Sequence, residues 1–131
     1  MKKIPLLLLI AACNTKPQAI KTITKNGVTL QVKKDDKAVK GGYEAFLIRI
    51  DYPKGMAFTK AQRLDIDNGL QEQIALISSK DTLTAVFFQR IASIAANRAE
   101  YLAAFDKPGT NTETLQITDN LFGLGRQQLT W

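Results

Sequence analysis

The sequence predicts an all-β fold, an antiparallel β-sandwich, formed by a single β-rich domain over residues 20–131. Apolar and polar residues alternate over several short segments, as they do in strands with one buried face. Turn signals such as Asn-Gly, Gly-Gly and Pro-Gly separate these segments. The chain of 131 residues is long enough for one domain and too short for two ordinary ones. The alternative is an α+β fold, in which residues 84–105 form an amphipathic helix packed on an antiparallel sheet.

Residues 1–12 have the pattern of an export signal rather than of a folded element. Lys2 and Lys3 precede an uncharged apolar run, and small residues stand before Cys13. The run is too short for a membrane-spanning helix, which needs about 20 apolar residues. We therefore predict a signal peptide over residues 1–12 and a short polar tether over residues 13–19.

The segment Ile10-Ala11-Ala12-Cys13 resembles the lipobox of bacterial lipoproteins. The resemblance implies that Cys13 carries a lipid after cleavage in front of it, and that the protein is anchored to a membrane of the bacterial cell envelope. Asn14, in place of Asp, resembles the residue that follows the cysteine in the outer-membrane class. The alternatives are a signal peptide with an incidental cysteine and an N-terminal membrane helix.

Positive charge is concentrated near the predicted tether. The formal charge of +6, which falls by two without Lys2 and Lys3, is too small for a nucleic-acid footprint. The lysines indicate a solvated face, with attraction to anionic headgroups as the alternative. They are Lys16, Lys21, Lys25, Lys33, Lys34, Lys37 and Lys40.

The composition excludes several kinds of chemistry. The sequence has no histidine and one cysteine, Cys13, which the lipid would occupy. Ser-His-Asp and Cys-His catalytic sites, disulfides, and metal sites built from cysteine or histidine therefore lack their residues. We expect no cofactor and no enzymatic activity.

The first predicted element is a β-hairpin over residues 20–33. Asn26-Gly27 is typical of a type I′ turn between β-branched runs. A two-residue loop pairs Lys25 with Val28 and Ile23 with Leu30, so the apolar residues of both strands share one face.

A second strand is predicted over residues 43–52, where apolar residues occur on both faces and indicate a position inside the sheet. Residues 56–69 indicate a connection with a short strand near residues 64–66, closed by Asn68-Gly69. Calcium binding at residues 65–69 is the alternative, but the glycine comes one place too early for an EF-hand and no glutamate follows at the required spacing.

The next segment alternates over residues 70–77 and predicts a strand, and residues 78–81 indicate a turn. Ser78 and Lys80 form a hypothetical Ser-Lys dyad, in which the lysine amine would take the hydroxyl proton. Two polar residues in a turn are the simpler interpretation.

Residues 84–105 contain conflicting signals. Their alanines and three-or-four spacing of apolar residues favour a helix, whereas the β-character of the rest of the chain favours strands. We predict strands over residues 83–92 and 99–106, joined by a turn near Asn97. Residues 80–83, followed by residues 100–105, resemble small β-sandwich lipoproteins of Bacteroidota.

The last predicted strands cover residues 112–118 and 126–131, with Gly123 and Gly125 marking a bend between them. The Gly-Leu-Gly segment lacks the third glycine and following helix of a dinucleotide loop. Seven or so short strands separated by turns are typical of an immunoglobulin-like sandwich.

Three functions are compatible with these patterns. The preferred one is a non-catalytic envelope lipoprotein that binds a protein partner as an accessory or scaffold subunit of an outer-membrane or periplasmic assembly. The second is a module that binds glycan or another ligand through Tyr43, Tyr52, Tyr101 or Trp131. The third and least favoured is a hydrolase with paired carboxylates, drawn from Asp51, Asp65, Asp67 and Glu72.

Overall fold

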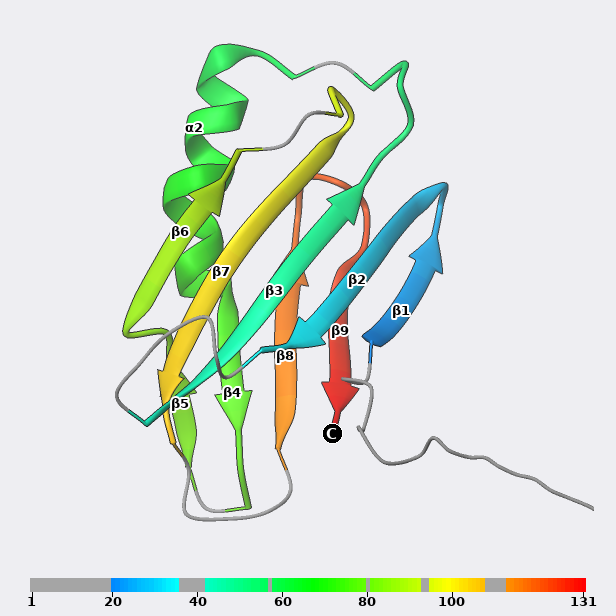
Figure 1. Ribbon diagram of the computed structural model, residues 1–131. Coiled ribbons are helices and arrows are strands. Elements are labelled where there is room, and N and C mark those ends of the chain that lie inside the picture. Colours follow the sequence, from blue (N-terminus) through cyan, green and yellow to red (C-terminus); the bar gives the residue numbers. More distant parts are fainter. Residues whose placement is uncertain (1–19, 36–41, 57, 80, 93–94, 108–112) are drawn as a thin grey trace, which may run out of the picture.

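The protein is a two-layer β-sandwich in the computed structural model, which describes residues 20–35, 42–56, 58–79, 81–92, 95–107 and 113–131 (Figure 1). The five-stranded sheet has the order β1-β2-β3-β7-β6, and the four-stranded sheet has the order β5-β4-β8-β9. Every pairing is antiparallel. The strands are β1 (Ile20–Lys25), β2 (Val28–Lys34), β3 (Tyr43–Asp51), β4 (Ile74–Ile77), β5 (Thr82–Thr84), β6 (Phe87–Ile91), β7 (Arg98–Asp106), β8 (Thr114–Asp119) and β9 (Gly125–Thr130).

The strand order is that of an immunoglobulin-like sandwich with one strand added. An immunoglobulin domain places strands A, B, E and D in one sheet and strands C, F and G in the other, with C′ joining C in some variants. Here β2-β3-β7-β6 corresponds to A-B-E-D, and β5-β4-β8-β9 corresponds to C′-C-F-G. The added strand is β1, which pairs with the outer edge of β2. The predicted sandwich is therefore confirmed.

The predicted hairpin is confirmed in its register. Lys25 pairs with Val28 and Ile23 with Leu30. Asn26 and Gly27 have φ angles of 55° and 78°, the positive values that a type I′ turn requires. The register of this hairpin follows from local signals, because its turn residues specify how the two strands meet.

Residues 84–105 form strands, so the alternative of an amphipathic helix is wrong. β7 alternates small and large inward residues, with Ala99, Tyr101, Ala103 and Phe105 buried. The alanines fit here because they face the centre of the sandwich between large aromatic rings. The single strand predicted over residues 83–92 is in fact two strands, β5 and β6, which belong to different sheets.

The strand predicted near residues 64–66 is also wrong, because these residues lie in helix α2 (Lys60–Gly69). Thr59 and Gln62 form a capping box: the amide of Gln62 donates to Thr59 Oγ1 at 3.1 Å, and the amide of Thr59 donates to Gln62 Oε1 at 2.9 Å. The predicted strand over residues 70–77 begins late, since Leu70–Gln73 form the 3-10 helix η2 before β4.

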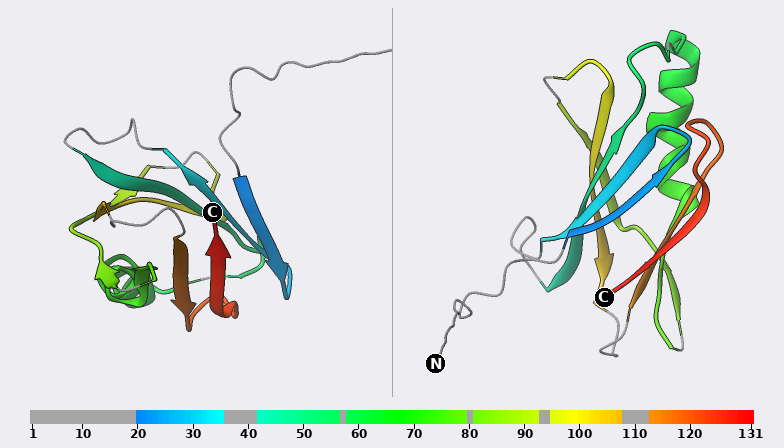
Figure 2. Two further views of the ribbon diagram at one scale, coloured as in Figure 1. Left: turned by 90° about the horizontal axis from the view of Figure 1, so that it is seen from below. Right: turned by 90° about the vertical axis from the view of Figure 1, so that its right-hand side faces the viewer.

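The core lies between the two sheets, which form separate layers with α2 on the side of the second sheet (Figure 2). The largest fully buried side chains come from both layers and exclude water from the space between them. They include Tyr101, Phe46, Phe105, Leu30, Ile48, Ile50, Ile74, Leu76, Leu115, Ile117, Leu124 and Val28.

The sandwich has two distinct ends (Figure 1). The loop end carries the β1–β2 turn, the connection from β3 to α2, the β6–β7 turn and the β8–β9 loop. The terminal end carries the starts of β3 and β8 and Trp131. β1 begins about halfway along the sheet, where Ile20 pairs with Lys33 and Lys33 pairs with Leu47 in the middle of β3. In the immunoglobulin correspondence, three connections at the loop end are the B–C, D–E and F–G loops, and the B–C and F–G loops carry antigen-binding segments in variable domains.

Candidate site at the loop end

Three hydrogen bonds join the β3–α2 connection to the β6–β7 turn. The amide of Tyr52 donates to the carbonyl oxygen of Asn97 at 3.0 Å, and Asn97 Nδ2 donates to the carbonyl oxygen of Tyr52 at 2.8 Å. The Tyr52 hydroxyl donates to the carbonyl oxygen of Ala96 at 3.0 Å. Because these bonds satisfy polar groups of both segments, they hold the two segments in one arrangement.

Three aromatic rings join the same connection to the β8–β9 loop. The ring centroids of Tyr52, Phe58 and Phe122 lie 5.1–5.3 Å from one another. The separations and tilted planes are those of favourable aromatic pairs. The buried carboxylate of Asp119 holds Phe122 in place by accepting hydrogen bonds at 2.9–3.1 Å from the amides of Leu121, Phe122 and Leu124.

A pocket of about 620 Å³ opens between these fixed segments. Its described lining combines apolar surface with two positively charged side chains and contains no carboxylate. This volume lies within the range of ligand-binding pockets, about 300–1,000 Å³. We call it the loop-end pocket, and it is lined by Tyr52, Lys54, Met56, Phe58, Arg63, Ala95, Ala96 and Asn97.

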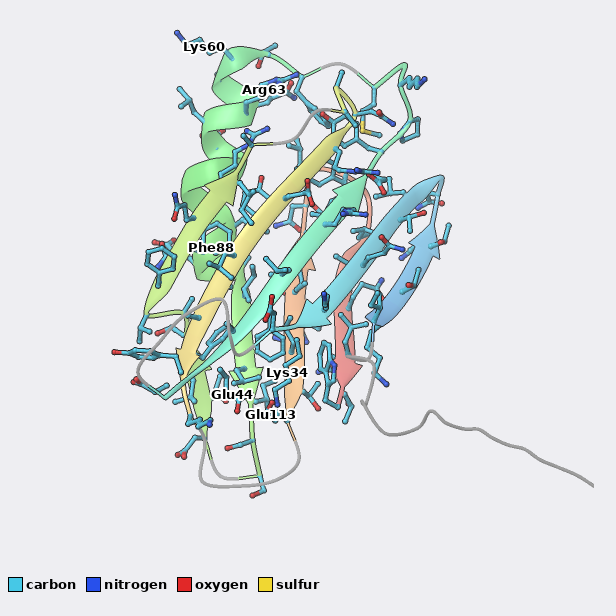
Figure 3. The ribbon with its side chains drawn as sticks, viewed as in Figure 1. Lys34, Glu44, Lys60, Arg63, Phe88 and Glu113 are labelled. Carbon is cyan, nitrogen blue, oxygen red and sulfur yellow. The ribbon has the colours of Figure 1, made fainter. Side chains whose placement is uncertain are left out.

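Lys54 and Arg63 are exposed at the mouth of the loop-end pocket. Neither side chain has an ion-pair partner within the part of the chain that the structure describes. Figure 3 shows Arg63 on the side of α2 that faces the connection from β3, whereas Lys60 projects from the top of the helix away from the sandwich. The pocket therefore presents uncompensated positive charge beside apolar surface.

A smaller pocket of about 210 Å³ lies beneath α2, against the β8–β9 loop. Its lining includes the carboxylates of Asp65 and Asp119. The carboxylate of Asp119 already accepts hydrogen bonds from the backbone amides of its own loop. Of the two carboxylates in this lining, the exposed Asp65 is therefore the one available to a ligand.

A buried charge cluster occupies the terminal end (Figure 3). Lys34 Nζ lies 2.7 Å from Glu44 Oε2 and 2.9 Å from Glu113 Oε1. The carboxylate side chains are only 7% and 4% exposed, while that of Lys34 is 28% exposed. The contact between Glu44 Oε2 and the ammonium is an ion pair, and this oxygen has no other polar partner among the described residues. The cluster contradicts the prediction that Lys34 belongs to a solvated face.

Two pKa values in this cluster are displaced in the same direction. Burial lowers the pKa of Lys34, but the contacts with Glu44 and Glu113 outweigh it and raise the pKa above 10.5. Burial raises the pKa of Glu113 above 4.5, and the neighbouring carboxyl of Glu44 adds to this, although Lys34 opposes it. The two carboxyl groups therefore compete for one ammonium.

The aromatic residues proposed from the sequence as ligand platforms serve mainly in packing. Tyr101 is fully buried and stacks on Phe88 with centroids 5.0 Å apart. Tyr52 is 6% exposed, and Trp131 packs on Phe46 with centroids 5.2 Å apart. Tyr43 is partly exposed at the start of β3, far along the sheet from the loop-end pocket.

The structure brings none of the proposed carboxylate pairs together in a described site. Asp51 accepts a 2.6 Å hydrogen bond from Arg98 Nε in a paired position on neighbouring strands. Asp65 and Glu72 are exposed on α2 and η2, and the side chain of Asp67 lies outside the described residues. The helix at residues 65–69 replaces the loop that a calcium site would need, and the described residues contain no metal-binding cluster of acidic side chains.

The hypothetical Ser78–Lys80 dyad has a simple structural counterpart. Ser78 Oγ accepts a hydrogen bond from the amide of Asp81 at 3.1 Å, and the amide of Ser78 donates a hydrogen bond to the carbonyl oxygen of Asp81 at 2.9 Å. These bonds form the predicted turn and occupy the hydroxyl. Lys80 lies outside the described residues.

Cys13 and the predicted signal peptide and tether also lie outside the described residues. Among the described helices, none has the length and apolar character needed to cross a membrane. No family model matches the chain, and no curated protein or solved structure matches it.

Proposed function

We propose that the protein is a lipid-anchored envelope lipoprotein of a bacterial membrane, most simply the outer membrane. It acts there as a non-catalytic accessory subunit and binds a protein partner through its loop end. Cys13 is the lipid attachment site in this proposal, and residues 14–19 are the tether. The lipid chains hold the domain at the bilayer surface, because each buried methylene contributes about 0.8 kcal/mol.

One observation carries the proposal: β1 runs toward the loop end, so the described chain begins at Ile20, level with the middle of β3 and away from the loop-end pocket. A tether that enters there, rather than at the loop end, allows the pocket to face away from the membrane. Hydrogen bonds and aromatic contacts hold the pocket's segments in place, which reduces the conformational entropy that binding would cost. A fixed, outward-facing pocket supports recognition of another molecule.

The experiment has two parts, lipidation and partner capture. Intact mass spectrometry of protein purified from native membranes should give the mass of residues 13–131 plus acyl chains. Pull-down from detergent-solubilised membranes should recover one protein in stoichiometric amount. A bare thiol with residues 1–12 retained refutes the anchor, and the absence of a stoichiometric protein refutes the accessory role.

A matched control separates the anchor from the binding surface. A Cys13→Ser variant should lose membrane attachment, while the folded domain and its loop end remain unchanged. If this variant stays in the membrane fraction after salt washing, the anchor is not at Cys13.

A further inference from the structure

The loop-end pocket has a charge pattern that restricts what can fill it. Two cations, Lys54 and Arg63, stand at its mouth, and its described lining offers no carboxylate to neutralise them. By contrast, Arg49 pairs with Glu100 at 3.2 Å and Arg98 pairs with Asp51 at 2.6 Å on the neighbouring sheet. The cations at the pocket are therefore available to an incoming anion.

Much of the described lining of the pocket is apolar. Met56 and Phe58 are partly buried, and Ala95 and Ala96 form the wall from the β6–β7 turn. Methionine adapts its shape to different apolar partners because its side chain is unbranched and flexible. Such a surface accommodates an apolar side chain next to the charge contacts.

From this juxtaposition we infer that the loop-end pocket binds an acidic segment of a partner protein, in which an apolar side chain lies next to carboxylates. The apolar side chain fills the space between Met56 and the β6–β7 turn, and a carboxylate pairs with Arg63. A guanidinium binds a carboxylate through two parallel hydrogen bonds, which gives both orientation and strength. Lys54 supplies a second, less directional positive charge. The inference rests on the proposed function, since it names the chemistry of the partner expected at the same surface.

A protein segment fits the position of the pocket better than a headgroup of the anchoring membrane. The pocket lies at the loop end, whereas the proposed tether enters at Ile20, about halfway along the sheet, so the tether does not hold the pocket against that bilayer. Its described lining comes from three chain segments, the β3–α2 connection, helix α2 and the β6–β7 turn.

The test begins with selection of random dodecapeptides displayed on phage against the mature lipidated protein in detergent micelles. The selected sequences should be enriched in Asp and Glu beside an apolar residue. The binding of one selected peptide, labelled with fluorescein, is then measured by anisotropy. The affinity should fall as salt is added, because exposed charge pairs are screened.

Two variants on the same helix provide a matched comparison. Arg63→Gln should weaken peptide binding at least about tenfold, the effect of losing one good charge-assisted contact. Lys60→Gln removes the same charge at a position that points away, and should change binding less than about twofold. Both side chains are exposed, so neither variant should alter the thermal unfolding of the domain. A Met56→Ser variant tests the apolar contact and should also weaken binding.

Several results overturn the inference. They are the selection of no peptide, selection without acidic residues, equal weakening by Arg63→Gln and Lys60→Gln, or complete displacement of the peptide by an equal concentration of inorganic phosphate.

The partner pull-down distinguishes failure of the acidic-segment inference from failure of the proposed function. If Arg63→Gln recovers the same partner in the same amount as the unchanged protein, the accessory role stands and the acidic segment does not. If the unchanged protein recovers nothing, the accessory role itself fails.

Discussion

Replacing Lys34 with Met should destabilise the protein through the buried charge cluster at the terminal end. The ammonium lies within 2.9 Å of a carboxylate oxygen of both Glu44 and Glu113, and methionine has a similar length without the charge. Removing one member of a buried ion pair costs about 3–5 kcal/mol, because the remaining charge stays buried without compensation. Lys34 is 28% exposed, so water screens part of this effect. We expect a loss of about 2–3 kcal/mol in the free energy of unfolding near neutral pH.

The loss should depend on pH. The pKa of Glu113 is raised in the folded protein, so the folded state binds this proton more tightly than the unfolded state. Stability from this group is therefore greatest at acid pH and falls as pH rises from about 4.5 through the folded pKa. Removing Lys34 takes away the group that opposes this shift, and the fall should become steeper. The pKa of Lys34 is also raised, so its stabilising effect in the unchanged protein is present below pH 10.5 and is lost as pH rises through the folded pKa.

Both the loss of stability and its pH dependence are measured by urea unfolding of residues 13–131 carrying Cys13→Ser. Circular dichroism monitors the unfolding at several pH values. Glu113→Gln is the matched control: it removes one of the two competing carboxylates, so it should flatten the pH dependence and change stability at neutral pH by less than about 1 kcal/mol. The Lys34→Met/Glu113→Gln double variant should be more stable than Lys34→Met alone. A loss below about 0.5 kcal/mol for Lys34→Met at both pH 5 and pH 8 would refute the electrostatic account of this cluster.

Three further substitutions test how the loop end is built. Asp119→Asn keeps one acceptor oxygen but loses the other, and should cost about 1–3 kcal/mol in urea unfolding; an unchanged midpoint would mean that the carboxylate does not organise the β8–β9 loop. Thr59→Ala removes the acceptor of the capping box and should cost about 0.5–2 kcal/mol, with faster hydrogen exchange in α2; unchanged exchange there would contradict the capping role. Gly27→Ala places a residue with a side chain at a φ of 78°, which such residues rarely adopt, and its Cβ would lie 3.4 Å from Pro53 Cγ. This variant should lose about 1 kcal/mol or more of stability in thermal unfolding. An equal or higher melting temperature would show that the turn adjusts without strain.

The sequence predicts those elements whose signals are local. The β1–β2 hairpin follows from Asn26-Gly27, and its register from the length of the turn. β3 follows from the alternation of Phe46, Ile48 and Ile50 with other residues, with both faces partly apolar, which agrees with its place between β2 and β7. The strand order cannot be obtained in this way, because β3 pairs with a strand that begins at Arg98 and no local pattern specifies that partner.

Helix α2 was missed although a signal for it is present. Thr59 and Gln62 have the spacing of a capping box, which marks the first turn of a helix. The apolar periodicity that normally reveals a helix is weak here, because residues 60–65 are all exposed and no buried stripe is needed. Asn68-Gly69 favours a turn after a short strand, whereas these residues end the helix.

The loop-end pocket depends on contacts between distant segments, so the sequence alone could not locate it. The sequence suggests Tyr52 as a ligand platform, but its hydrogen bonds to Ala96 and Asn97 make it a buried link between two chain segments. The sequence indicates a solvated face for Lys34 because its neighbours in sequence are charged. Its neighbours in space are Glu44 in β3 and Glu113 directly before β8, and they change its role.

The added strand β1 determines how the proposed anchor and the loop-end pocket are related. Without it, the chain would enter at the start of β2, which lies at the loop end beside the binding surface. Ile20 is seven positions after Cys13, and an extended chain spans at most about 3.6 Å per residue, so the proposed tether reaches about 25 Å. β1 has six residues and so places about 20 Å between Ile20 and the loop end. The proposed tether therefore joins the domain away from the loop-end pocket, and β1 separates the two, which leaves the pocket accessible to a partner protein.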